Sequence, residues 1–145
     1  MTELPPESVV RVLICDDYAP MRALLRLIIE DRSGFTVVGE AGSGQEALAV
    51  AKQLQPDVVL LDLAMPRTTG LAALEEMARV APSSNVVIFS GFSMASIGVD
   101  PVTLGAVSYL QKGASPDAII EAIEHAAAAS PVTKLAAIRG APKVD

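Results

Sequence analysis

Residues 58–62 have the sequence VVLLD, four apolar residues followed directly by an acid. An unbroken apolar run of this length is typical of a strand buried on both faces, as strands in the middle of a parallel sheet are. The stretch VLICDD at residues 12–17 has the same form and ends in two acids. The two stretches therefore predict buried strands that each deliver carboxylates at the carboxyl end.

Apolar runs and helical patterns alternate along the rest of the chain. The runs typical of strands cover residues 9–15, 35–38, 58–61, 86–89 and 107–110. Apolar residues spaced three and four apart predict helices near residues 21–29, 44–54, 71–78 and 116–127. The segment between the last two strands contains Gly98 and Asp100-Pro101, which predict a short or broken helix there.

This alternation determines the expected architecture. Strands that alternate strictly with helices predict a parallel sheet covered by helices on both faces. Five such units favour an α/β flavodoxin-like (βα)5 fold with strand order 2-1-3-4-5. The 145 residues are the size of one domain. We expect a single domain over residues 8–129, preceded by an extension (1–7) and followed by a tail or linker stub (130–145).

Composition narrows the possible functions. Aromatic residues make up only 3% of the chain, so the core must be aliphatic. A net charge of −6, with no run of Lys or Arg, argues against direct DNA binding. The single cysteine, Cys15, lies in an apolar run and is expected to be a buried, inert thiol. No signal peptide or membrane-spanning stretch is evident, so we expect a cytoplasmic protein without membrane contact.

Polar side chains stand at the ends of four of the five predicted strands. In a doubly wound sheet the ligand site lies at the carboxyl ends of the strands, where the strand order reverses. The residues delivered to this edge are three acids, a hydroxyl and an amine: Asp16, Asp17, Asp62, Ser90 and Lys112.

The chemistry of this set is that of phosphoryl transfer. Clustered carboxylates repel one another, and a hard divalent cation such as Mg²⁺ relieves the repulsion. A carboxylate can also act as a nucleophile and form an acyl phosphate. Ser90 could donate a hydrogen bond to a phosphate oxygen, and Lys112 could place a positive charge beside another.

Four motifs give the chain a family resemblance. Residues 8–128 resemble the CheY-like receiver domains of two-component response regulators, through VLICDD (12–17), VVLLDLAMPRTTG (58–70), VVIFSG (86–91) and AVSYLQKG (106–113). Two further phrases, VVGEAGSGQEAL (37–48) and KGASPDAIIEAI (112–123), are most similar to the NarL/LuxR-type subfamily. That subfamily usually carries a C-terminal helix-turn-helix domain, which this sequence does not include.

The resemblance implies a role for each residue at the predicted edge. Asp62 would be the phosphoacceptor. Mg²⁺ would be bound by Asp17 directly, by Asp16 mostly through water, by Asp62 and by the backbone carbonyl of Ala64. Ser90 and Lys112 would bind the phosphoryl group.

The resemblance also assigns residues around the site. Ser90 and Tyr109 would form a switch pair, in which the ring turns inward as the hydroxyl moves to the phosphate. Pro66 and Gly70 would shape the loop after Asp62. Gly113 stands where many receivers have proline, so a cis-proline constraint on the Lys112 loop is absent.

The implied partners follow from the same resemblance. A sensor histidine kinase would donate the phosphoryl group, and the output would pass to an unknown downstream protein or a homodimer. The switching surface would be formed by the fourth helix, the fifth strand and the fifth helix. Such a protein catalyses only its own phosphorylation and dephosphorylation.

The sequence also permits three other interpretations, and it contains one isolated histidine. A Mg²⁺-dependent aspartyl-phosphate phosphatase would carry D-x-D, whereas residues 62–64 are DLA. A second alternative is the receiver fragment of a DNA-binding transcriptional regulator. The segment 42–47 fits a dinucleotide-binding pattern, but it follows a short strand expected at the sheet edge and leaves the acids unexplained. His125, the only histidine, is expected on a solvated helix surface.

Overall fold

The computed structural model describes residues 9–65, 70–91 and 105–129, and all structural statements below concern these residues. Its elements are β1 (Val10–Cys15), α1 (Ala19–Glu30), β2 (Phe35–Ala41), α2 (Gly44–Leu54), β3 (Val58–Leu61), α3 (Gly70–Val80), β4 (Asn85–Ser90), β5 (Ala106–Gln111) and α5 (Pro116–Ala128). The short or broken helix expected after β4 falls on residues 92–104, outside the described part. Pro66, the extension and the tail also lie outside it.

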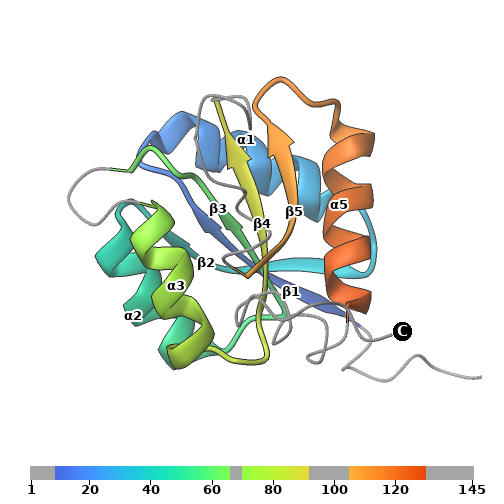
Figure 1. Cartoon of the computed structure of the whole chain (residues 1–145). Coiled ribbons are helices and arrows are strands. Elements are labelled where there is room, and N and C mark those ends of the chain that lie inside the picture. Colours follow the sequence, from blue (N-terminus) through green and yellow to red (C-terminus); the bar gives the residue numbers. More distant parts are fainter. Residues whose placement is uncertain (1–8, 66–69, 92–104, 130–145) are drawn as a thin grey trace, which may run out of the picture.

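The five strands form one parallel sheet in the order β2-β1-β3-β4-β5. This confirms the expected flavodoxin-like order. Figure 1 shows α2 and α3 together on one face of the sheet, with α1 and α5 on the other. Because β1 and β3 are neighbours near the middle, their carboxyl ends meet at the point where the strand order reverses.

β2 is longer than the sequence predicts. The expected strand stops at Val38, whereas the structure continues it to Ala41, which pairs with Cys15 of β1. The register shifts between Val12 and Leu13, whose partners are Val37 and Gly39, so Val38 is an extra residue in β2. The predicted strand ends too early because Gly39 and Glu40 are not apolar, although their backbone continues to pair with β1.

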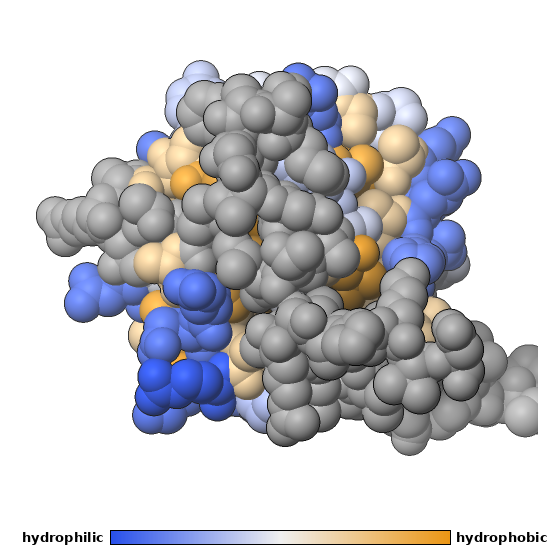
Figure 2. All heavy atoms as spheres, viewed as in Figure 1, coloured by the Kyte–Doolittle hydropathy of each residue, from blue (hydrophilic) through white to orange (hydrophobic). Residues whose placement is uncertain are grey.

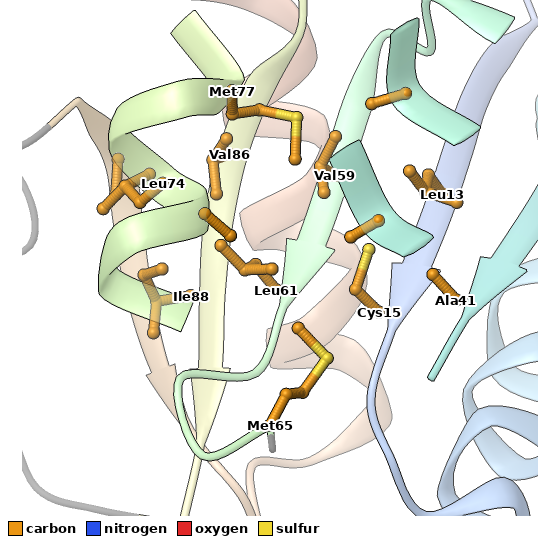
Figure 3. Close-up of a cluster of buried hydrophobic side chains, with 14 of the residues drawn as sticks. Leu13, Cys15, Ala41, Val59, Leu61, Met65, Leu74, Met77, Val86 and Ile88 are labelled. Atoms are coloured by element: carbon orange, nitrogen blue, oxygen red, sulfur yellow. The ribbon is translucent and has the colours of Figure 1, made fainter. Parts of the chain in front are cut away.

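The core has two layers, one on each face of the sheet. On the face covered by α2 and α3, Leu61 of β3 and Ile88 of β4 lie beside Leu74 and Met77 of α3 (Figure 3). On the other face, Leu60 of β3 belongs to the cluster formed with α1 and α5. Alternate residues of one strand therefore serve both layers, and this explains the unbroken apolar run of β3.

Hydrophilic side chains gather on the outer surfaces of three of the helices, whereas α1 exposes Leu24 and Leu27. In the view of Figure 2 they gather over α2 and α3 at the lower left and over α5 on the right. Within the described residues, no helix is both long enough and apolar enough to cross a membrane.

Truncating the core of β3 should destabilise the protein strongly. Leu61 is completely buried, so Leu61→Ala should lower the free energy of unfolding by about 2–5 kcal/mol, through lost burial and a residual cavity. Leu27→Ala is the matched control, because Leu27 on α1 is 71% exposed. Urea unfolding of both variants measures the difference, and equal losses would contradict the assigned core.

Candidate functional site

Three carboxylates meet at the carboxyl edge of β1 and β3. Asp16 and Asp62 are almost completely buried, with 1% and 2% exposure, while Asp17 is exposed. The backbone holds them in place, because Asp62 N–H donates to the Cys15 carbonyl (2.9 Å) and Asp16 N–H to the Ala41 carbonyl (3.0 Å). Each acid offers an oxygen within 4.8 Å of the others. The structure thus brings together the three acids that the sequence predicts at this edge.

Lys112 places its ammonium between the two buried acids. Its Nζ lies 2.7 Å from Oδ2 of Asp16 and 3.0 Å from Oδ2 of Asp62. Burial of the ammonium lowers its pKa, but the hydrogen bonds and charges of Asp16 and Asp62 outweigh burial, so the pKa of Lys112 is raised. The amine therefore stays protonated and offsets part of the repulsion between the carboxylates.

The remaining oxygens of the buried acids accept backbone hydrogen bonds. Oδ1 of Asp62 accepts from Ala64 N–H (3.0 Å), and Oδ1 of Asp16 accepts from Tyr18 N–H (2.9 Å). Both bonds span two residues and fix the rotation of the carboxylate relative to the loop that follows its strand. Ala64 is exposed beside Asp62, and Gly70 is the first residue of α3.

Ser90 and Tyr109 lie on neighbouring strands next to the acids. Ser90 is completely buried at the end of β4, and its carbonyl accepts from Lys112 N–H at 2.6 Å. Tyr109 of β5 pairs with Ile88, two residues before Ser90, and packs against the core layer of α2 and α3. Burial raises the pKa of Tyr109, and the nearby Ser90 side chain partly offsets this. The Tyr109 hydroxyl is buried, although the residue as a whole is only partly buried.

The loop that carries Lys112 depends on a glycine. Gly113 has φ +105°, in the left-handed region that glycine enters without strain. Proline, which keeps φ near −65°, could not take this conformation. The glycine at this position therefore matches the observed path of the chain.

Two residues outside the site are as predicted. Cys15 is buried, and burial raises the pKa of its thiol far above the ordinary value, which makes it unreactive. His125 is exposed in the last turn of α5.

The glycine-rich segment after β2 is a helix start. Ser43 Oγ accepts from Glu46 N–H (3.1 Å), and Glu46 Oε1 accepts from Gly42 N–H (2.7 Å), a reciprocal cap on α2. β2 is an edge strand and not the central first strand that a dinucleotide site would follow. Helix capping therefore accounts for this segment.

An ionic cluster that the sequence did not predict lies beside the acids. Arg22 of α1 donates through Nε to Oε1 of Glu40 (2.9 Å) and through Nη1 to the Asp16 carbonyl (2.6 Å). Arg26 donates through Nε to the other Glu40 oxygen (2.9 Å). The i, i+4 spacing of Arg22 and Arg26 indicates that both arginines lie on the same face of α1. Glu40, however, lies beyond the strand end predicted from the sequence.

Glu40 should make stability depend on acid pH. Burial raises the pKa of Glu40, but the hydrogen bonds and charges of Arg26 and Arg22 outweigh it and lower the pKa. A lowered folded pKa adds stability that is present above the ordinary value of 4.5 and lost as pH falls through the folded value. Glu40→Gln should cost about 1 kcal/mol at pH 7 and nothing near pH 2. Urea unfolding across pH checks this, and a pH-independent loss would contradict it.

The sequence model of the response regulator receiver domain matches residues 12–124, most of the chain. The chain belongs to the response regulator receiver family.

Relatives of this receiver include both short and longer proteins. It is 34% identical over 113 residues to the chemotaxis protein CheY of Thermotoga maritima, covering 78% of this chain and 93% of CheY. It is 37% identical over 118 residues to the transcriptional regulatory protein YxjL of Bacillus subtilis, covering 81% of this chain but only 54% of YxjL. The receiver domain of a NarL response regulator from Mycobacterium tuberculosis superposes with a TM-score of 0.79 at 28% identity, over 85% of this chain and 99% of that one.

Membership of this family places the receiver in two-component signalling. Its site combines a buried carboxylate, a cluster of acidic ligands and a positive charge within hydrogen-bond distance. Such a set can bind a divalent cation and accept a transferred group on a carboxylate oxygen.

Proposed function

We propose that this receiver accepts a phosphoryl group on Asp62 from a sensor histidine kinase and thereby switches a protein-interaction surface. One observation carries the proposal: Asp62 lies at the centre of the polar edge, within 4.8 Å of two further acids and 3.0 Å from the Lys112 ammonium. Asp16 also contacts this ammonium, so the choice of Asp62 over Asp16 rests on the receiver-like motif VVLLDLAMPRTTG (58–70), whose acid is Asp62.

The acids fit a magnesium ion. Asp16, Asp17 and Asp62 provide oxygen ligands, which Mg²⁺ prefers, and the exposed Asp17 leaves room for water on the cation. We assign Asp17 and Asp62 as direct ligands, Asp16 as a mostly water-mediated one, and the Ala64 carbonyl as the fourth protein ligand. When bound, Mg²⁺ would offset the negative charge of the carboxylates and of the phosphoryl oxygens.

The phosphoryl step uses the chain's own carboxylate. An oxygen of Asp62 attacks phosphorus, the bond between phosphorus and the donor atom breaks, and the donor leaves with the bonding electrons. With phosphohistidine the leaving group is the imidazole, which then takes a proton from solvent. Lys112 would exchange its contact with Asp62 for a phosphoryl oxygen, and the Ser90 hydroxyl would donate to another.

Ser90 and Tyr109 connect this step to the surface. As the Ser90 hydroxyl moves toward the phosphoryl group, the ring of Tyr109 would turn inward into the space that the hydroxyl leaves. Because Tyr109 lies on β5, next to α5, its position would bias the surface formed by β5, α5 and the segment between β4 and β5. Pro66 and Gly70 would shape the loop between Asp62 and α3.

Partners and context are proposed on the same basis. The donor is a sensor histidine kinase, and the output is a downstream protein or a second copy of this chain, in the cytoplasm. The acidic net charge of −6 opposes direct DNA binding by this chain. We keep residues 8–129 as the receiver domain, with the extension (1–7) and tail (130–145) outside it.

One observation favours a second candidate. The chain spans about half the length of YxjL, a transcriptional regulatory protein. The receiver could therefore act as the regulatory part of a longer regulator whose other part binds DNA. The chemistry at Asp62 would be the same in both cases.

Incubation with acetyl phosphate tests the proposal. Intact mass should show a gain of one phosphoryl group with Mg²⁺ and none with EDTA. Release of phosphate from a small phosphomonoester at many turnovers would instead favour the phosphatase alternative. An unchanged mass under every metal condition would contradict phosphoryl acceptance.

A further inference from the structure

Arg22 touches the backbone that joins two of the acids. Its Nη1 donates to the Asp16 carbonyl at 2.6 Å, and this carbonyl belongs to the peptide group between Asp16 and Asp17. On the other side of the same residue, Asp16 N–H donates to the Ala41 carbonyl of β2. The acidic pair is therefore held from β2 on one side and from α1 on the other.

Arg22 is itself held by a partner on β2. Its Nε lies 2.9 Å from Oε1 of Glu40, while Arg26 occupies the other Glu40 oxygen at 2.9 Å. The Arg22 side chain is only 21% exposed. A guanidinium can hold two acceptors in a fixed fork, whereas a lysine ammonium has one nitrogen and no such fork.

Charge alone does not explain an arginine at this place. A positive charge beside an acidic site repels a divalent cation and would weaken its binding. A surface ion pair such as Arg22–Glu40 is also worth little stability on its own. The contact with the Asp16 carbonyl provides a reason of a different kind, because it sets the orientation of the peptide that separates two ligands.

We infer that Arg22, held by Glu40, is a positioning residue that orients the Asp16–Asp17 peptide so that both carboxylates face the bound cation. The inference rests on the proposed Mg²⁺ site and adds Arg22 and Glu40 to it as supporting residues. Loss of a residue that orients metal ligands typically weakens metal binding about 10- to 100-fold.

Calorimetric titration of the full chain with Mg²⁺ tests the inference. Arg22→Gln should bind Mg²⁺ about 10-fold more weakly than wild type, although it removes a repelling positive charge. Arg22→Lys should lie between the two, because it can reach one acceptor at a time. Arg26→Gln is the matched control, since Arg26 shares Glu40 but contacts neither Asp16 nor Asp17 through any described bond. It should stay close to wild type.

Each outcome of the titration supports or overturns the positioning role of Arg22. Binding by Arg22→Gln as tight as wild type, or tighter, would overturn the inference and leave the metal site intact. An equal loss in Arg26→Gln would also overturn it, by assigning the effect to the ion cluster as a whole. If Arg22→Gln does not fold by circular dichroism, Arg22→Lys decides by the same criterion. Failure of wild type to bind Mg²⁺ would overturn the proposed metal site, and the inference with it.

Discussion

Asp62→Asn is expected to abolish Mg²⁺-dependent phosphorylation while leaving the fold intact. Asparagine has nearly the same shape, and the contact of Lys112 with Asp16 remains. The amide, however, has no anionic oxygen to attack phosphorus, so the loss should be complete rather than partial. Intact mass after incubation with acetyl phosphate and Mg²⁺ measures it.

Asp31→Asn is the control for this substitution. Asp31 is exposed at the C-terminal end of α1, so its variant should gain the phosphoryl group like wild type. Circular dichroism of both variants shows whether the fold is kept. A full mass gain in Asp62→Asn would place the acceptor elsewhere and contradict the assignment.

Lys112→Met is expected to make the protein depend on Mg²⁺ for stability. Without the ammonium, the buried carboxylates of Asp16 and Asp62 lose their cationic partner. Removing one member of a fully buried ion pair typically costs about 3–5 kcal/mol, and the cost here should lie below that range because the Lys112 side chain is 24% exposed. Mg²⁺ would bind the same carboxylates and offset their charge, and in this variant it would not compete with the amine. Mg²⁺ should therefore restore more stability in Lys112→Met than in wild type.

Urea unfolding in EDTA and in saturating Mg²⁺ gives the two values. Lys52→Met is the matched control, because Lys52 is exposed in the last turn of α2 and should respond to Mg²⁺ like wild type. The raised pKa of Lys112 also predicts how stability depends on pH. The contribution of Lys112 to the free energy of unfolding is present below the ordinary lysine pKa and is lost as pH rises through the folded value. If Mg²⁺ raised the free energy of unfolding equally in Lys112→Met and wild type, the proposed competition between Mg²⁺ and the Lys112 amine would be contradicted.

The strand order and the polar edge could be predicted because they depend on local patterns. β3 is buried on both faces and is apolar at every position, so its bounds, Val58–Leu61, match the prediction. Once strands and helices alternate, the topology brings the acids at the ends of β1 and β3 to one edge. Asp16, Asp17 and Asp62 could therefore be grouped without coordinates.

Other features depend on contacts between distant segments. The extension of β2 through Gly39 and Glu40 comes from backbone pairing with β1, and the pattern of apolar side chains gives no indication of this pairing. Because Glu40 was placed outside the strand, its contacts with Arg22 and Arg26 could not be foreseen. Lys112 was expected to bind a phosphoryl oxygen, and only the structure shows that it bridges two buried acids.

Chemical trapping tests most directly whether the phosphoryl group resides on Asp62. Borohydride reduces an acyl phosphate to the alcohol, which would convert a phosphorylated Asp62 to homoserine. Peptide mapping of the wild-type chain after acetyl phosphate, Mg²⁺ and borohydride should then find homoserine at position 62 and nowhere else. Homoserine at Asp16, Asp17 or another acid, with Asp62 unmodified, would contradict the account.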